Sequence, residues 1–405
     1  MTNQESPVET ATAADWDAIW QFFNTAFHLP PDDEEKASEA RLYEPQRGLL
    51  VRDGGQVVAH AAAYSRELTV PGAVLPAAHV SLVAVAATHR RQGLLRRLMT
   101  RQLRDVHDAG REPIAVLWAS EGRIYPRFGY GLATQRLHLS IDTHEVGPPP
   151  PAGPVRVASA TSCQAELAEL YDRLRPQRPG WSSRDGRWWH HLLRTPRSKD
   201  GATGQWAACY AGPDGLEGYA TFRTRSNWSD WVPHGEVKVE QVVAATGQAY
   251  AALWRFLLTI DLTRTVSYSF AALDEPLQHL VEEPRQLRGR LLDGLWLRLV
   301  DVPRALAARR YAADIDTVLE ITDDLLPENS GRWRLSAGPT GAHCARTQDP
   351  ADLACDVRDL GAVFLAGTPL TALAGGRVRE LRPGALARAT VAFGWHRQPA
   401  SQETF

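Results

Sequence analysis

The segment from residue 83 to residue 98 limits the folds open to this chain, because it must form a strand, a basic turn and a helix in direct succession. An apolar run ends near Val85, arginines flank Gly93, and an amphipathic helix follows at once. The first N–H groups of a helix lack acceptors within the helix, and the helix dipole adds partial positive charge there. The segment therefore predicts a diphosphate site, although an ordinary strand–turn–helix with a solvated basic face has the same spacing.

A second informative segment follows at residues 114–131, where the apolar run of a buried strand leads into E-G-R-I-Y-P-R-F-G-Y-G. Together the two segments resemble the GNAT superfamily of acetyl-CoA-dependent N-acetyltransferases, whose strand-to-helix turn holds the diphosphate of coenzyme A. The strings T-H-R-R-Q-G-L-L and W-A-S-E-G-R-I-Y-P-R-F-G-Y-G are similar to the Eis (enhanced intracellular survival) branch, whose members acetylate amines of aminoglycosides and other polyamines. Leu95 departs from the family pattern, which usually has Gly or Ala there.

Composition bounds the class of protein. The 405 residues exceed one ordinary hydrophobic core, so two or three domains are expected, and 44% hydrophobic with 23% charged residues is typical of a soluble globular protein. A formal net charge of −2 gives no global reason to bind nucleic acid, and no apolar run is long enough to span a bilayer. The four cysteines show no C-x-x-C pairing, and the N-terminus lacks the apolar core of a signal peptide. We therefore expect a cytoplasmic protein without a metal, whose partners are small molecules rather than nucleic acid or membrane.

The first domain is predicted at residues 1–146. Apolar residues at helical spacing predict a helix over Trp16–Phe27, and Asp53-Gly54-Gly55 between two apolar runs predicts a hairpin. The proline-rich run at 147–154 cannot continue a helix or an inner strand, so we interpret it as a linker to a second domain.

The second domain, predicted at 155–300, repeats the succession of hairpin, strand and helix. Its turn at 244–248 carries no arginine, so this copy is expected to bind no coenzyme. Eis-like proteins carry such a tandem. The third domain, predicted at 301–405, has a helix followed by alternating runs and resembles the sterol-carrier-protein-like fold of Eis C-termini. The predicted fold class is therefore α+β: tandem GNAT folds, the first active and the second degenerate, then a sterol-carrier-protein-like α+β domain.

The resemblance implies which residues bind acetyl-CoA. In the GNAT fold the coenzyme strand separates from its neighbour, and its backbone pairs with the pantetheine arm. The basic turn surrounds the diphosphate, and the segment after the next strand lies beside the thioester. The implied coenzyme-binding residues are Val83, Ala84, Val85, Arg91, Gln92, Gly93, Leu94, Leu95, Arg96, Ser120 and Glu121.

Two residues are candidates for proton transfer. Tyr125 is the candidate general acid, because a tyrosine hydroxyl with an intrinsic pKa of about 10 stays protonated at neutral pH and can donate to a forming thiolate. The spacing of residues in the first domain reveals no general base. The resemblance implies that the C-terminal carboxylate, here that of Phe405, is the base. The alternatives are a tyrosine packed under the glycine turn and a frayed tail.

Acidic residues are candidates for contacts with the amine substrate. Asp32 and Asp33 could attract a polycation, and Glu403 lies beside the proposed base. Asp32 or Asp33 is also expected to cap a helix whose first turn favours acidic residues, and both roles can hold at once, because a helix start can still face a cleft. The pair His190-His191 has no carboxylate or cysteine at ligand spacing, so no metal site is predicted.

These observations predict transfer of acetyl from acetyl-CoA to primary amines of small polycationic substrates. Transfer is expected to be direct, in a ternary complex, because no cysteine accompanies the motif as an acyl carrier. The resemblance implies an aminoglycoside acceptor and a homohexamer. Two alternatives are a protein lysine N-acetyltransferase with a flatter site and a non-catalytic protein that binds lipid or coenzyme A.

Overall fold

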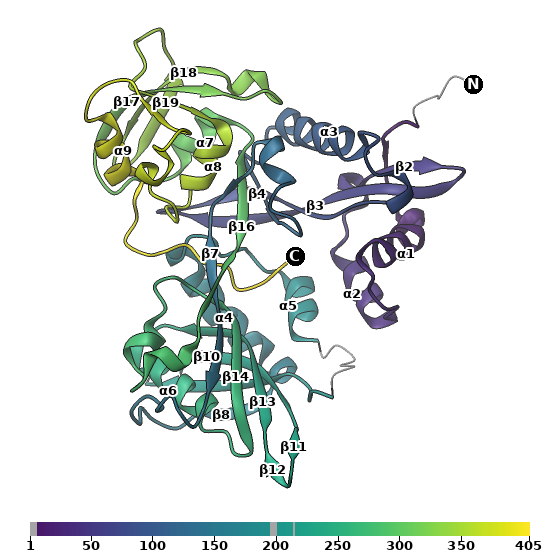
Figure 1. The fold of residues 1–405 in the computed structure, drawn as a ribbon, viewed down its shortest axis with the longest axis vertical. Coiled ribbons are helices and arrows are strands. Elements are labelled where there is room, and N and C mark those ends of the chain that lie inside the picture. The colour runs from purple at the N-terminus through teal and green to yellow at the C-terminus, as the bar shows by residue number, and fades with distance from the viewer. Residues whose placement is uncertain (1–5, 195–200, 214) are drawn as a thin grey trace. The chain divides into compact units, whose positions relative to one another are not determined.

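The computed structural model of the protein describes residues 6–194, 201–213 and 215–405 (Figure 1). Contacts between residues divide the chain into two compact units. The first unit contains the chain up to Thr134, together with Gly294–His396 and Phe405. The second contains Gln135–Asp293 and Arg397–Thr404. The chain therefore passes more than once from one unit to the other.

A seven-stranded mixed sheet forms the first half of the first unit. Only its pairing of β4 with β5 is parallel. In spatial order the strands are β1 (Glu9–Thr10), β2 (Leu49–Asp53), β3 (Gln56–Val70), β4 (Ala73–Val85), β5 (Ile114–Trp118), β16 (Leu295–Leu299) and β6 (Gly131–Leu132).

Helices cover both faces of this sheet. The helices α1 (Trp16–Phe27) and α2 (Asp33–Leu42) lie on one side of the strands, and α3 (Leu94–Ala109) lies on the other (Figure 1). Because side chains alternate along a strand, Leu50 packs with Ile19 of α1, whereas its neighbour Val51 packs with Leu98 of α3. The helix and the hairpin predicted from the sequence are confirmed.

The second half of the first unit is a five-stranded sheet with three helices. In spatial order the strands are β19 (Ala342–Arg346), β18 (Gly331–Ala337), β17 (Ile315–Thr322), β20 (Leu353–Asp356) and β21 (Arg379–Glu380). The helices are α7 (Val302–Ala308), α8 (Val357–Val363) and α9 (Ala385–Phe393). At Gly361 of α8, a Cβ atom would lie 2.2 Å from the carbonyl oxygen of Leu297. Helix α8 therefore packs directly against β16, and one hydrophobic core joins the two halves.

The second unit has the same strand order as the first sheet. In spatial order its strands are β8 (Arg156–Ser159), β9 (Trp206–Gly212), β10 (Gly215–Arg225), β13 (Gly235–Ala244), β14 (Thr263–Ala271), β7 (Gln135–Asp142) and β15 (Arg290–Asp293). Only β13 and β14 pair in parallel, in the place that β4 and β5 hold in the first sheet. Its helices are α4 (Gln164–Leu174), α5 (Gly186–Leu193) and α6 (Gly247–Leu258), and β11 (Trp228–Ser229) pairs with β12 (Val232–Pro233). The repeat predicted from the sequence thus extends to the topology.

The two sheets exchange a strand, which the predicted boundaries did not anticipate. The strand β7, which the sequence analysis assigned to the first domain, pairs in the second sheet, and β16, assigned to the second domain, pairs in the first. The residue before β7 and the first residue of β16 are in contact, because the Thr134 hydroxyl accepts a hydrogen bond from the Leu295 N–H at 2.8 Å. The domain boundaries predicted at residues 146 and 300 therefore do not separate the strands of the two sheets. Local periodicity does not reveal which distant strand becomes a neighbour.

Candidate active site

The site in the first unit begins where β4 leaves its neighbour β5. The two strands pair from Ala77–Ile114 to Val80–Leu117, whereas β4 continues to Val85. Beyond Val80, no strand among the described residues pairs with the edge of β4 that faces β5. An unpaired strand edge offers N–H and C=O groups to another extended chain. This is the edge at which the resemblance implies pairing with pantetheine.

A β-bulge reshapes the same stretch of β4. The pairing of β3 with β4 shifts between His60 and Ala62. Opposite this shift, Leu82 adopts a φ of 52°, which is rare for a side chain of its size. Bulges re-aim the groups of a strand and often lie next to active sites. Here the bulge lies directly before Val83, whose side chain is partly buried.

A buried histidine holds this bulge in place. His60 Nδ1 lies 2.9 Å from the carbonyl oxygen of Leu82, and its Nε2 lies 3.1 Å from the Tyr43 hydroxyl. Because a carbonyl oxygen only accepts, Nδ1 carries the proton, and Nε2 accepts from Tyr43. Burial lowers the pKa of His60 to about 4, so the ring is neutral at physiological pH. The sequence analysis did not identify this residue, since nothing in its spacing distinguishes it from a core residue.

A cavity of about 130 Å³ lies beside the bulge. It is enclosed by α1, by β4, by the end of β5 and by the C-terminal residue. Four residues that the sequence analysis singled out line it together: Val83, Ser120, Tyr125 and Phe405. The other lining residues are Phe23, Phe27, Val80, Ser81, Leu82 and Trp118. The structure thus gathers residues from four distant parts of the chain around one space.

Tyr125 is held rigidly at the wall of this cavity. It begins a short 3₁₀ helix, Tyr125–Phe128, and its side chain is 5% exposed. Its ring meets the ring of Tyr130 edge to face, with centroids 6.1 Å apart. Burial raises the pKa of Tyr125 to about 12, because the phenolate is poorly solvated there. The hydroxyl therefore keeps its proton throughout the physiological range.

Phe405 packs against a second buried histidine. The rings of Phe405 and His79 meet at 61°, with centroids 4.6 Å apart. His79 Nδ1 lies 3.0 Å from the carbonyl oxygen of Ala77. Burial, followed by the charges of Arg66 and Arg47, lowers the pKa of His79 well below its usual range. The neutral ring of His79 therefore anchors the side chain of Phe405. The sequence analysis did not identify His79.

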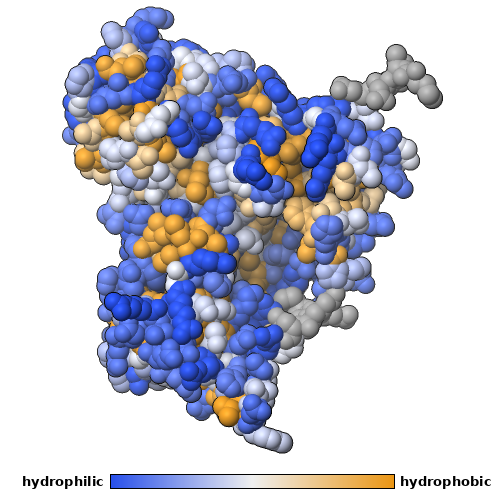
Figure 2. Space-filling view, viewed as in Figure 1, coloured by the Kyte–Doolittle hydropathy of each residue, from blue (hydrophilic) through white to orange (hydrophobic). Residues whose placement is uncertain are grey.

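The basic turn lies open at the start of α3. Arg91 and Gly93 have φ values of 64° and 79°, and Gly93 caps α3 without a side-chain hydrogen bond. Nothing lies within 4 Å of the position that a Cβ atom of Gly93 would take. The Arg91 and Arg96 side chains are exposed and have no ion-pair partner in the part of the chain that the structure describes. Strongly hydrophilic side chains gather over α3 (Figure 2). The geometry fits a diphosphate.

The remaining residues of the implied coenzyme site have mixed surroundings. Gln92 and Glu121 are exposed, and Gln92 Nε2 donates to the carbonyl oxygen of Thr88 at 3.4 Å. Leu95 packs against the apolar cluster beneath α3, which explains why a large side chain is tolerated where the family has a small one. The side chains of Ala84 and Leu94 are buried and that of Val85 is half-buried.

Asp32 and Glu403, two of the acidic residues predicted to contact substrate, make contacts within the protein. Asp32 caps α2 and accepts from the Glu35 N–H at 2.9 Å, whereas Asp33 is exposed in the first turn. The helix-capping alternative is therefore confirmed for Asp32. Glu403 belongs to the second unit, where it is 4% exposed and paired with the buried Arg184, whose Nε lies 2.5 Å from its Oε2. The charge of Glu403 is thus paired within the protein, and its contact with an amine substrate stays a prediction.

The second repeat lacks the open helix start of the first. Thr246 caps α6, and its hydroxyl accepts from the Ala249 N–H at 3.1 Å. No arginine stands between 244 and 248. A diphosphate at this end of α6 would therefore compete with the protein's own cap and meet no cation of the turn.

Neither a metal centre nor a membrane segment is evident in the described residues. Residues 6–194, 201–213 and 215–405 contain no group of three or more His, Cys, Asp or Glu side chains arranged to hold a metal ion. Within the same ranges, no helix is both long and apolar enough to cross a bilayer.

Family descriptions match all three parts of the chain. An acetyltransferase (GNAT) domain matches residues 7–133, a second acetyltransferase (GNAT) domain matches 180–299, and a sterol carrier protein domain matches 302–402. The predicted fold class is thereby confirmed.

Known proteins resemble the chain over nearly its whole length. An uncharacterized N-acetyltransferase of Streptomyces avermitilis is 43% identical over 387 residues, which cover 94% of each chain. The N-acetyltransferase Eis of Mycobacterium tuberculosis is 37% identical over 377 residues, which cover 89% of this chain and 90% of that protein. The crystal structure of Eis1 from Mycobacterium abscessus superimposes with a TM-score of 0.84 at 32% identity, covering 99% of this chain and 100% of that one.

Proposed function

This chain belongs to the Eis-type GNAT N-acetyltransferases, which use acetyl-CoA, and on that basis we propose that it acetylates a primary amine of a small polycationic molecule such as an aminoglycoside. The observation that carries the proposal is the cavity of about 130 Å³, because the proposed acid, the proposed base and two proposed donor contacts all line it. A lysine side chain of a protein remains the alternative acceptor, and the experiment below distinguishes the two.

In the proposed reaction, the nitrogen lone pair of the amine attacks the thioester carbon, and the carbon–sulfur bond breaks. Tyr125 donates its hydroxyl proton to the leaving sulfur, for which its high pKa of about 12 keeps it protonated. The C-terminal carboxylate of Phe405 accepts the proton that the amine nitrogen loses. An ordinary α-carboxyl has a pKa of about 3.5, so its carboxylate is a weak base. It can accept the proton because the pKa of the attacking nitrogen falls as the new bond forms.

We propose that backbone N–H groups at the β4 bulge stabilise the carbonyl oxygen of the thioester during the reaction. Backbone N–H groups aimed at a developing oxyanion stabilise it most when they need not reorganise during the reaction. The hydrogen bond from His60 to the carbonyl oxygen of Leu82, at 2.9 Å, supports such a fixed arrangement. The exposed Arg91 and Arg96, with the open start of α3, are proposed to hold the diphosphate of the donor.

A polycationic acceptor is proposed on the acidic residues that follow α1 in the chain. Phe23 and Phe27 of α1 line the cavity, and the chain runs from α1 into the acidic first turn of α2, which contains Asp33, Glu34 and Glu35. Fixed negative charge near a site concentrates cations, and salt screens this attraction. We also propose that the protein is a homohexamer, which light scattering of the purified chain tests directly.

The decisive experiment measures thiol release from acetyl-CoA with an aminoglycoside, a linear diamine and a lysine-containing peptide as acceptors. Mass spectrometry counts the acetyl groups added to each. We expect the fastest turnover with the aminoglycoside and more than background turnover with the diamine. Faster turnover of the peptide would identify a protein lysine acetyltransferase instead. Binding of acetyl-CoA by calorimetry without thiol release from any amine would identify a non-catalytic binding protein.

A further inference from the structure

The parallel strands of the second repeat separate as those of the first repeat do. The pairing of β13 with β14 ends at Val239–Tyr268, whereas β13 continues to Ala244. A cavity of about 260 Å³ lies beside this opening, and residues 242–245 line it. The corresponding opening of the first repeat is the proposed donor site, but the capped, arginine-free turn of the second repeat disfavours a diphosphate. The opening between β13 and β14 therefore suits a different occupant.

The last residues of the chain form part of the wall of this cavity. Residues 397–404 belong to the second unit, and Ala400 and Gln402 line the cavity together with Val242 and Tyr268. The Tyr268 hydroxyl donates to Gln402 Oε1 at 3.4 Å. The four residues from Ala400 to Glu403 are all buried, whereas chain ends usually fray. The C-terminal segment is therefore bound beside the opening of the two strands.

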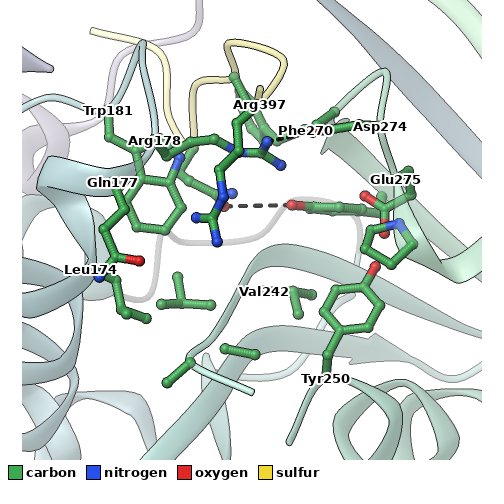
Figure 3. Close-up of a pocket in the computed structure, with 18 residues that line it drawn as sticks. Leu174, Gln177, Arg178, Trp181, Val242, Tyr250, Phe270, Asp274, Glu275 and Arg397 are labelled. Atoms are coloured by element: carbon green, nitrogen blue, oxygen red, sulfur yellow. Dashed lines mark hydrogen bonds and ion pairs between the residues drawn. The ribbon is translucent and has the colours of Figure 1, made fainter. Parts of the chain in front are cut away.

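Arg178 and Asp274 hold both backbone groups of Gln398. Arg178 Nη1 donates to the carbonyl oxygen of Gln398 at 3.0 Å and pairs with Asp274 Oδ2 at 2.7 Å. The same carboxylate oxygen accepts from the Gln398 N–H at 3.1 Å. At the cavity, Arg178 lies between Trp181 and Glu275 (Figure 3). One ring of hydrogen bonds thus closes around the backbone of Gln398.

The next contact along the tail is between backbone groups. The Ala400 N–H donates to the carbonyl oxygen of Pro179 at 2.9 Å. Gly180 has a φ of 93°, and a Cβ atom there would overlap the carbonyl oxygen of Ala400. Only glycine allows the backbone to approach the tail this closely. Residues 178–180 therefore hold residues 398–400 mainly through the backbone of the tail.

A buried ion pair holds the tail at Glu403. Arg184 Nε donates to Glu403 Oε2 at 2.5 Å, and Arg184 Nη1 donates to Gln241 Oε1 of β13 at 3.1 Å. The central guanidinium carbon of Arg184 lies 3.8 Å from the ring centroid of Tyr171 and 4.8 Å from that of Trp189. Such cation–π contacts add to the attraction between the charges. Arg184 is thus held by a strand and by two rings, and it holds the carboxylate of Glu403 in turn.

We propose that the second repeat is a binding site for the C-terminal segment of its own chain, and that Asp274 and Arg184 are positioning residues for the Phe405 carboxylate. The positioning role rests on the proposed function, in which that carboxylate is the base. Only Thr404 separates Glu403 from Phe405, and two extended residues span at most about 7 Å. The ion pair of Glu403 therefore limits how far the carboxylate can move.

This restriction matters for the reaction, because a catalytic group accelerates a step only when it is held in the productive geometry. A tail that moves freely would place its carboxylate beside the nitrogen of the amine for only part of the time. The second repeat thus contributes to acetyl transfer without binding the donor. Loosening the tail should lower kcat and leave donor binding unchanged.

The test uses two variants of the full-length protein. Asp274→Ala removes the acceptor of the Gln398 N–H, and it should not prevent folding, because the Asp274 side chain is 34% exposed. We expect hydrogen exchange of the Gln398 and Ala400 amides, followed by mass spectrometry, to become at least tenfold faster. We expect kcat to fall at least tenfold, while the KM and the calorimetric Kd for acetyl-CoA change less than twofold. Arg184→Lys keeps the charge but loses the fork of the guanidinium, so it should show a smaller loss of kcat.

The matched control is Asp142→Ala. Asp142 lies in the same unit, pairs with Arg264 at 3.1 Å and accepts from the His144 N–H at 3.0 Å. It therefore makes the same two kinds of contact as Asp274, but with residues outside the tail. This variant should leave both the exchange of the tail and kcat at the wild-type level.

The outcomes separate this inference from the proposed function. Unchanged exchange of the tail in Asp274→Ala would overturn the assignment of the tail site. Faster exchange with unchanged kcat, in a protein whose wild type acetylates amines, would overturn the positioning role and leave the transferase activity established. An equal loss of kcat in Asp142→Ala would also overturn the positioning role, because the effect would then not depend on the tail. A wild type that releases no thiol with any amine would refute the proposed function and the positioning role together, whereas faster exchange in Asp274→Ala would still support the tail site.

Discussion

Glu275 should make the protein less stable as the pH rises from about 4.5 towards neutrality. Its side chain is 6% exposed, and burial raises its pKa from 4.5 to about 7, with opposing contributions from backbone N–H groups and Arg178. In the unfolded chain the carboxyl titrates near its ordinary value. Between the two pKa values the folded protein therefore binds more protons than the unfolded chain, so stability falls as the pH rises from about 4.5 to about 7. A shift of this size corresponds to roughly 2–3 kcal/mol between pH 5 and pH 8.

The assay compares the wild-type protein with Glu275→Gln, whose amide mimics the neutral carboxyl. Hydrogen exchange of the amides of β13 and β14 reports the free energy of opening of the unit that contains Glu275. The substitution should be nearly neutral at pH 5 and stabilising by roughly 2 kcal/mol at pH 8, because only the wild type then carries a buried charge. Glu166→Gln is the exposed control and should show no such difference. An equal effect of Glu275→Gln at both pH values would refute the reasoning, since Glu275 would then ionise as freely as a solvated carboxyl.

Four further predictions concern the first unit and the C-terminal tail. Tyr125→Phe should lower kcat by roughly 10²–10⁴ and leave the KM for acetyl-CoA nearly unchanged, and an unaltered kcat would remove Tyr125 from the mechanism. A peptide tag added after Phe405 should abolish transfer while circular dichroism stays native; an active tagged enzyme would exclude the C-terminal carboxylate as base. Arg91→Ala should raise the KM for acetyl-CoA and reduce its salt dependence, as initial rates at two salt concentrations will show. Arg184→Met should cost about 3–5 kcal/mol, because it removes the cation that pairs with the buried Glu403 carboxylate, and in a double-mutant cycle the added Glu403→Leu should restore most of that loss.

Local patterns in the sequence were sufficient for the individual elements. The helical spacing over Trp16–Phe27 and the turn at Asp53–Gly55 each predicted an element that the structure contains. The motif around Gly93 and the segment around Tyr125 carried enough specificity to identify the family. Such signals are local, because the period of apolar residues and the conformational freedom of glycine act within a few positions of the chain.

The cavity in the first unit depended on positions far apart in the chain. His60 and His79 have no motif, and their roles follow from contacts with Leu82 and Phe405 that only the folded chain creates. The same holds for Glu403, whose neighbours in sequence gave no sign of the buried Arg184. A residue's partner across such a distance depends on the register of the sheet and on the packing of whole elements.

The sequence by itself determined the family, the order of the three folds and the residues proposed for acid, base and donor contacts. The tertiary structure alone decided which strand completes each sheet, since β7 and β16 are exchanged between the repeats. It alone also revealed that the second repeat, whose turn at 244–248 carries no arginine, contains a cavity of its own. The physical reason is that periodicity and turn chemistry act along the chain, whereas strand pairing, burial and the pKa values that follow from burial are set by residues that meet only after folding.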